Sequence, residues 1–247
     1  MILLNWRNIT NKLIDAAIDY KYLLTKGYPQ KSTLDFVSTR YTLSKQERLL
    51  LFRCIHSNQY VSEVGSKLMC TKINNFVLLL DFYNILISTI NALRGGEVYL
   101  CDDCVARDLR GSKLREDDYS YLLNALKVVA SIVKALEPLN VLAIVDKNVS
   151  HSSEHSMAFV REFESLGLRC AFELTSTPDS KLIRYSKEFA NTIVATSDSV
   201  VMMYSLRIVP MTTYIMFFLN VKPAFDFTQL FNSDCSKCFD QFKHAIH

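Results

Sequence analysis

Apolar residues at the start of the chain recur at the spacing of an α-helix. Residues 10–26 carry them three or four positions apart, and Gly27 then provides a helix stop. A shorter helix is predicted over residues 32–37. Ser44 stands three positions before Glu47, the capping-box arrangement that opens a helix, so a third helix is expected there. The pattern predicts a small all-helical module.

Further along, short and nearly continuous apolar runs alternate with amphipathic helices. The runs are residues 76–80, 98–100, 141–145, 169–174, 193–195 and 207–209. Helices are predicted at residues 117–136, 153–166 and 179–189, with another beginning near Ser199. This alternation is typical of an α/β fold, a doubly wound and mainly parallel sheet flanked by helices. We therefore predict a helical module at residues 1–70, an α/β domain at residues 73–221 and a C-terminal extension at residues 222–247.

The composition is that of a folded protein with an uneven charge distribution. Of 247 residues, 49% are hydrophobic and only 6 are Gly and 5 Pro, which excludes a linker-rich or disordered chain. Residues 1–72 hold 11 Lys or Arg and 5 Asp or Glu, a net charge of +6, whereas the remainder holds 17 and 20, a net charge of −3. The basic module is expected to approach RNA or another nucleic acid, and docking on the acidic domain is the alternative.

The sequence favours a cytoplasmic location. Residues 1–4 are apolar but lack the basic flank of an export signal, and the most apolar stretches, residues 76–87 and 208–221, are too short or too interrupted to span a bilayer. Seven cysteines, an odd number in a chain of this size, favour reduced thiols over a disulfide framework. We therefore expect no membrane partner.

Acidic residues follow several of the predicted strands. Asp81, Asp146 and Asp198 each close an apolar run, and Asp102 with Asp103 follows another. Because ligands gather at the carboxyl ends of parallel strands, these carboxylates are expected on one rim, where they would repel one another without a cation. Mg²⁺ or Mn²⁺ suits such oxygen ligands. For any single position, a helix N-cap or a turn residue is the alternative.

Polar neighbours of these acids are candidates for supporting roles. Asn84, Thr196 and Ser199 could orient a carboxylate or a metal-bound water, or could simply begin helices. Three cations follow the acidic pair and could hold a phosphate: Arg107, Lys113 and Arg115. For Lys113 and Arg115 a solvated loop is the favoured alternative.

Five motifs carry a resemblance to a known family. They are LLTKGYP at residues 23–29, FVSTRYTLS at residues 36–44, LDFYNIL at residues 80–86, DDCVARD at residues 102–108 and ATSDS at residues 195–199. Together they resemble the prokaryotic family called domain of unknown function 434, over about residues 10–210. The second half of that family is similar to the PIN and NYN nuclease superfamily, in which an Asp-x-x-Asn strand end and later Asp residues hold metal ions.

The resemblance implies a PIN-like fold and a metal-dependent endoribonuclease using one or two Mg²⁺ or Mn²⁺ ions. Asp81, Asp146 and Asp198 match the catalytic metal ligands of the superfamily, and Asp102 or Asp103 is a further candidate ligand. Two metal ions would activate a water and stabilise the leaving oxygen of a phosphodiester.

Two departures keep other functions open. Phe82 replaces the usual glycine after the first acid, and residues 151–155 lack an expected glycine, so bulk there could narrow the approach of a nucleic-acid backbone. One alternative is a PIN-like module that binds RNA or a ribonucleoprotein without cleaving it. The other is a protein-interaction module or homo-oligomer, suggested by a mean hydropathy of +0.10 and by an apolar group. That group is Met202, Met203, Tyr214, Met216, Phe217 and Phe218.

Two zinc-like motifs are weighed and set aside. His151, Glu154 and His155 have the spacing of an inverted zincin motif, but no Glu follows residue 188 to complete a site. Two Cys-x-x-Cys pairs, at residues 101–104 and 235–238, are too far apart along the chain for a zinc ribbon. Zinc is therefore considered unlikely, and no glycine-rich nucleotide loop is present.

Overall fold

The chain begins with a layer of four helices. A computed structural model describes residues 9–111 and 113–235. The helices are α1 (Asn11–Thr25), α2 (Gln30–Arg40), α3 (Lys45–Cys54) and α4 (Asn58–Lys67). The predicted capping box of α3 is confirmed, because the Glu47 N–H donates to Ser44 Oγ at 3.2 Å and the Ser44 N–H donates to Glu47 Oε2 at 2.7 Å. The predicted helical module is confirmed, and α4 was not predicted.

A five-stranded sheet forms the centre of the second part. Its strands are β1 (Val77–Asp81), β4 (Asn140–Asp146), β5 (Cys170–Thr175), β6 (Thr192–Ala195) and β7 (Ile208–Val209). All neighbouring pairs are parallel, in the order β5-β4-β1-β6-β7. The predicted α/β class with a parallel sheet is confirmed, and the arrangement is consistent with a PIN-like fold. Strand order reverses between β1 and β6, where an open α/β sheet forms its ligand crevice.

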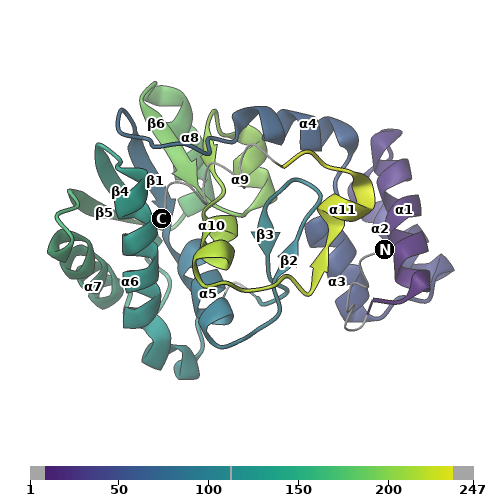
Figure 1. Ribbon diagram of the computed structural model, residues 1–247, viewed down its shortest axis with the longest axis horizontal. Coiled ribbons are helices and arrows are strands. Elements are labelled where there is room, and N and C mark those ends of the chain that lie inside the picture. Colours follow the sequence, from purple (N-terminus) through teal and green to yellow (C-terminus); the bar gives the residue numbers. More distant parts are fainter. Residues whose placement is uncertain (1–8, 112, 236–247) are drawn as a thin grey trace.

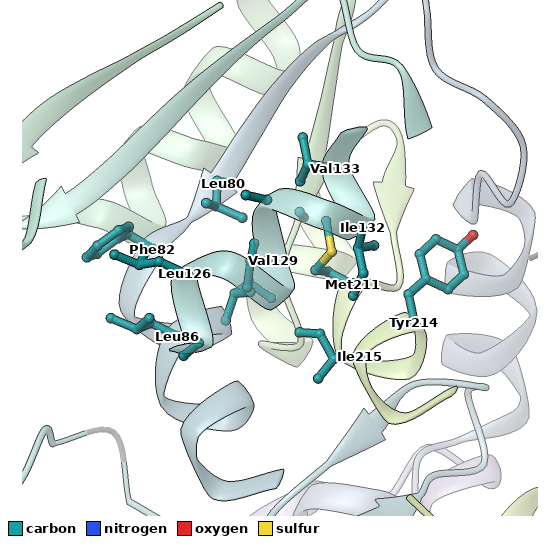
Figure 2. Packing of buried hydrophobic residues seen from close by; sticks show 14 of the residues in the cluster. Leu80, Phe82, Leu86, Leu126, Val129, Ile132, Val133, Met211, Tyr214 and Ile215 are labelled. Atoms are coloured by element: carbon teal, nitrogen blue, oxygen red, sulfur yellow. The ribbon is translucent and has the colours of Figure 1, made fainter. Parts of the chain in front are cut away.

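Helices cover both faces of this sheet (Figure 1). One face carries α5 (Phe82–Leu93), α6 (Tyr119–Leu136), α7 (Ser152–Ser165) and α10 (Met211–Phe218), and the other carries α8 (Pro178–Glu188) and α9 (Ser199–Tyr204). A one-turn 3₁₀ helix, Glu116–Asp118, precedes α6. Figure 2 shows the main core, in which Leu80 of β1 lies near Val129 of α6 and Met211 of α10. These contacts fix the strand ends.

A second, smaller sheet lies between the parallel sheet and the helical module (Figure 1). It contains β2 (Tyr99–Leu100), β3 (Ala106–Arg107) and β8 (Phe225–Asp226), and β8 leads into α11 (Phe227–Phe231). The placement of residues 98–100 in the parallel sheet was therefore wrong. The turn at residues 101–105 folds the chain back, so β3 pairs antiparallel with β2.

Burial corrects two expectations about the end of the chain. Met202, Tyr214 and Met216 are buried at 0 to 2% exposure, so half of the apolar group belongs to the core, whereas Phe218 is exposed. Cys104 and Cys235 form a disulfide, against the predicted reduced thiols. This bridge joins the segment after α11 to the β2–β3 turn. Cys238 and residues 236–247 of the predicted extension lie outside the described residues.

One described segment, Glu116–Leu136, is long and apolar enough to cross a membrane by length and composition alone. It contains α6, whose Leu126, Val129 and Val133 are at most 2% exposed within the main core. Such burial is that of a core helix in a soluble α/β protein.

Candidate functional site

A cavity of about 490 Å³ opens at the carboxyl edge of the parallel sheet. Five acidic residues line it. Four lie at the edge of the sheet: Asp81 at the end of β1, Asp146 at the end of β4, Asp179 in the first turn of α8 and Asp198 directly before α9. The fifth, Asp108, directly follows β3, and its Oδ1 accepts from the Arg110 N–H at 2.7 Å. The structure thus brings Asp81, Asp146 and Asp198 to one cavity at the switch point of the sheet. Four carboxylates around one space favour a cation there.

Asp81 is the most deeply placed of the four acids at the sheet edge, at 6% exposure. Burial raises the pKa of its carboxyl to about 7, and the carboxylates of Asp179 and Asp198 add to this, against a 2.6 Å hydrogen bond donated by Thr196 Oγ1. Thr196 Oγ1 also accepts from the Asp198 N–H at 3.1 Å, so one hydroxyl links the two acids. A carboxyl near half-protonation at neutral pH is ready to exchange its proton for a metal ion.

Asp146 and Asp198 also have local structural roles. Asp198 Oδ1 accepts from the N–H groups of Val200 and Val201 and caps α9, as the N-cap alternative expected. Asp146 Oδ1 accepts from the backbone and side-chain nitrogens of Asn148, both at 2.9 Å. In both residues these bonds involve Oδ1, so Oδ2 remains for other ligands.

Asp179 is a site residue that the sequence reasoning missed. Burial and the nearby carboxylates of Asp198 and Asp146 raise its pKa. Asp179 does not end a strand, so the search for strand-end acids passed over it. It lies in the first turn of α8, four positions after β5 ends at Thr175. An acid at that position reaches the same edge as the strand-end acids.

The same cavity is lined by three arginines as well. Arg107 of β3 and Arg110 come from the second part of the chain, and Arg53 comes from α3 of the helical module. Arg53 donates to the carbonyl oxygens of Asp108 and Arg110 at 2.7 and 3.0 Å. Arg110 is held by the carboxylate of Asp118, while its buried Nε has no partner among the described residues. The cavity therefore combines cation-binding carboxylates with anion-binding guanidinium groups.

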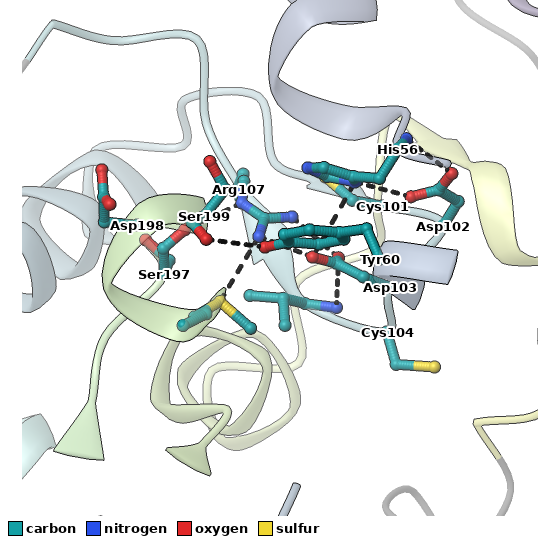
Figure 3. Close-up of polar contacts among 12 residues, drawn as sticks. His56, Tyr60, Cys101, Asp102, Asp103, Cys104, Arg107, Ser197, Asp198 and Ser199 are labelled. Carbon is teal, nitrogen blue, oxygen red and sulfur yellow. Dashed lines mark hydrogen bonds and ion pairs between the residues drawn. The ribbon is translucent and has the colours of Figure 1, made fainter. Parts of the chain in front are cut away.

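Arg107 is fixed by a buried ion pair (Figure 3). Both of its terminal nitrogens donate to the Asp103 carboxylate at 2.7 Å, and its Nε donates to the Ser197 carbonyl at 2.8 Å. Arg107 and Asp103 are 5% and 1% exposed. Arg107 thereby holds the loop that carries Asp198. It lines the cavity, and it also has this structural role.

Asp102 and Asp103 do not line the cavity, because β2 belongs to the second sheet. Asp102 accepts from Lys21 Nζ at 2.7 Å. It also accepts from the His56 N–H at 2.9 Å, and its other oxygen lies 2.8 Å from His56 Nδ1 (Figure 3). His56, Asp102 and Asp103 each place a ligand atom within 4.8 Å of the others, a cluster that could hold a metal ion. Lys21 and Arg107 already balance the two carboxylates, so a metal there would compete with both.

The remaining predicted site residues divide into two groups. Asn84 and Ser199 line the cavity, and Asn84 Oδ1 accepts from the N–H and Oγ of Ser197, both at 2.9 Å. Lys113 and Arg115 are exposed and do not line it. Phe82 is 1% exposed and also lies outside the lining, so its bulk does not narrow the cavity.

The two histidines of the zincin-like motif do not line the cavity. His151 is exposed with its Nδ1 3.1 Å from Glu154, whereas His155 is buried with its Nδ1 3.0 Å from the Tyr83 hydroxyl. Burial lowers the pKa of His155, and His151 adds to this.

Comparison with known families accounts for most of the chain. A family described as "Domain of unknown function (DUF5616)" matches residues 70–214, and "Protein of unknown function (DUF434)" matches residues 12–67. The chain belongs to the DUF434–DUF5616 family. It is also 31% identical over 201 residues to the "Uncharacterized protein MJ0935" of Methanocaldococcus jannaschii, covering 75% of this chain and 86% of that protein. No solved structure gives a significant match.

The two family parts meet at the site. The DUF5616 domain supplies the five cavity acids with Arg107 and Arg110, and the DUF434 module supplies Arg53. The DUF434 module also supplies Lys21 and His56 to the buried cluster with Asp102 and Asp103. The two parts therefore share one buried ionic junction directly behind the cavity. Lys21 is paired with Asp102 in this junction, so it is not available to contact nucleic acid.

Proposed function

We propose that the chain is a metal-dependent phosphodiesterase of the PIN-like type that cleaves RNA. The observation that carries this proposal is the single cavity in which Asp81, Asp146, Asp179 and Asp198 accompany three arginines. Burial and, after it, the neighbouring carboxylates raise the pKa values of Asp81 and Asp179, and a divalent cation would relieve the part due to the carboxylates. Carboxylate oxygens favour Mg²⁺ or Mn²⁺.

The chain's own residues divide the work of the reaction. Asp81, Asp146 and Asp198 would hold one or two ions, and Asp179 would add a further negative charge to the cavity. Arg53, the least buried of the three arginines, would hold the phosphate, while Arg107 and Arg110 stay paired with Asp103 and Asp118. Thr196 fixes the Asp81 carboxylate by its hydrogen bond. When bound, the cation supplies Lewis-acid activation of the attacking water and of the leaving oxygen. The net charge of the helical module, which supplies Arg53, favours a polyanionic strand over a small phosphate ester.

A second candidate function is RNA binding without cleavage. It is favoured by the capping bonds of Asp198, which already engage one carboxylate oxygen in the fold. In that case the cavity would bind a metal and a phosphate without turnover.

The test is cleavage of end-labelled, unstructured RNAs by the purified chain. We expect products with Mg²⁺ or Mn²⁺ and none with a chelator, because the acids alone supply no activated water. Tight binding of several RNAs with neither metal producing cleavage would overturn the enzyme and support the second candidate. Cleavage that continues in the chelator would contradict both.

A further inference from the structure

A second cavity, of about 320 Å³, lies beside the acidic one, between the helical module and α9. Its lining is rich in tyrosine, with Tyr28 before α2, Tyr60 on α4 and Tyr204 at the end of α9. Ser199 lines both cavities, so they are neighbours along one surface. The Tyr60 hydroxyl donates to the Ser199 carbonyl at 3.0 Å, which fixes the wall between them.

We propose that this cavity binds an unpaired base of the RNA strand whose phosphate occupies the acidic cavity. The inference rests on the proposed function in one respect only, that the acidic cavity takes a nucleic-acid phosphate. It adds that the substrate is single-stranded next to the cleaved bond.

Two tyrosines offer free ring surface to such a base. Tyr28 and Tyr204 are 59% and 55% exposed, although both line the cavity. Exposed aromatic rings at a concave site are stacking platforms for bases, and stacking tolerates any base because each has a π-face. Lys187 Nζ lies over one face of the Tyr204 ring, 5.6 Å from its centre, so a base would stack on the opposite face with a positive charge nearby for the adjoining backbone.

The inner wall keeps hydrogen-bonding capacity that the fold does not use. His56 is stacked on Tyr60, with ring centres 4.4 Å apart and 16° between the planes (Figure 3). Its Nδ1 is held by Asp102, whereas its Nε2 is buried without a partner among the described residues. His56 itself is 6% exposed and lines the cavity beside Gln30 and Ser57, and the Ser57 Oγ already accepts from the Tyr60 N–H as the N-cap of α4. The edge of a base carries hydrogen-bond donors and acceptors, and one of these would give His56 Nε2 the partner that it lacks.

The experiment measures the binding of a short fluorescein-labelled RNA without secondary structure. It uses the full chain in Ca²⁺, which binds carboxylate oxygens without the octahedral geometry that Mg²⁺ requires. We expect Tyr204→Ala and Tyr28→Ala each to raise the Kd roughly tenfold, the usual effect of losing one base stack. Tyr204→Phe should keep wild-type affinity, because the ring is retained. The matched control is Phe189→Ala, which removes a 50% exposed ring that lines neither cavity.

Two comparisons keep this inference separate from the proposed function. The same RNA annealed to its complement should bind Tyr204→Ala and wild type alike, because paired bases are not available for stacking. Metal-dependent cleavage with an unchanged Kd in both alanine variants would overturn the base site while leaving the nuclease intact. Loss of affinity in both variants, without cleavage in Mg²⁺ or Mn²⁺, would support the base site and contradict the nuclease. Failure of the wild-type chain to bind the RNA would overturn the base site directly.

Discussion

Asp81→Asn is expected to abolish metal-dependent cleavage, lowering kcat/KM by roughly a hundredfold or more, since even the loss of a group that only orients a ligand costs 10 to 100-fold. Asp81 lies at the switch point of the sheet, where it is the most buried of the four acids at the sheet edge. The change keeps its shape and its bond from Thr196 but removes the charge that holds the cation. Initial rates over a range of Mn²⁺ concentrations measure the effect, with Glu164→Gln, an exposed carboxylate of α7, as control.

The same variant must remain folded for that result to count. In the folded chain burial raises the pKa of Asp81 to about 7 from its ordinary value of 3.8, so the metal-free fold binds the proton more tightly than the unfolded chain does. Its stability should therefore fall as pH rises from about 4 through 7. Metal-free Asp81→Asn should be more stable than wild type at pH 8, by at most about 4 kcal/mol, and the gain should vanish near pH 4. A variant less stable at pH 8 would contradict the burial argument.

Arg107→Ala is expected to destabilise the protein by about 3–5 kcal/mol, the cost of leaving one partner of a buried ion pair alone. The change leaves the Asp103 carboxylate, which is 1% exposed, without its arginine partner, and it removes the donor to the Ser197 carbonyl. Urea unfolding measures the loss. Lys113→Ala, at an exposed position that was predicted to bind phosphate, should change stability by about 0.5 kcal/mol or less.

A paired change separates the ion pair from simple loss of packing. The double variant Asp103→Leu with Arg107→Met should be less destabilised than Arg107→Ala, because it leaves no buried charge unpaired. Equal destabilisation of the single and the double variant would mean that the charge balance contributes little and that shape alone matters.

The parallel sheet was predictable because each of its strands is short, apolar and bounded by polar turns. The strand-end acids followed from the same pattern, since Asp81, Asp146 and Asp198 come directly after or close to buried runs. Residues 98–100 have a similar local pattern yet pair in another sheet. Their partner β8 lies more than a hundred residues away, and no local signal reports such a pairing.

The partners of the buried charges were equally hidden from the sequence. Lys21 and Asp102 are 81 positions apart, and nothing in the basic charge of the helical module shows that one of its lysines is buried. Arg53 reaches the cavity only because α3 packs beside the β3 turn, where it donates to the Asp108 carbonyl. Asp179 was visible only as the start of a helix. Tertiary packing decided which charges face a cavity and which are neutralised within the fold.

The most direct measurement is the position of Mn²⁺ in crystals of the full chain, read from anomalous scattering. The account predicts a peak within about 2–2.5 Å of carboxylate oxygens of Asp81 and at least one of Asp146 and Asp198, the distance range of oxygen-bound divalent cations. Asp81→Asn crystals should lose the peak. A peak between His56, Asp102 and Asp103 instead, or none in the acidic cavity at millimolar Mn²⁺, would contradict the proposed metal site.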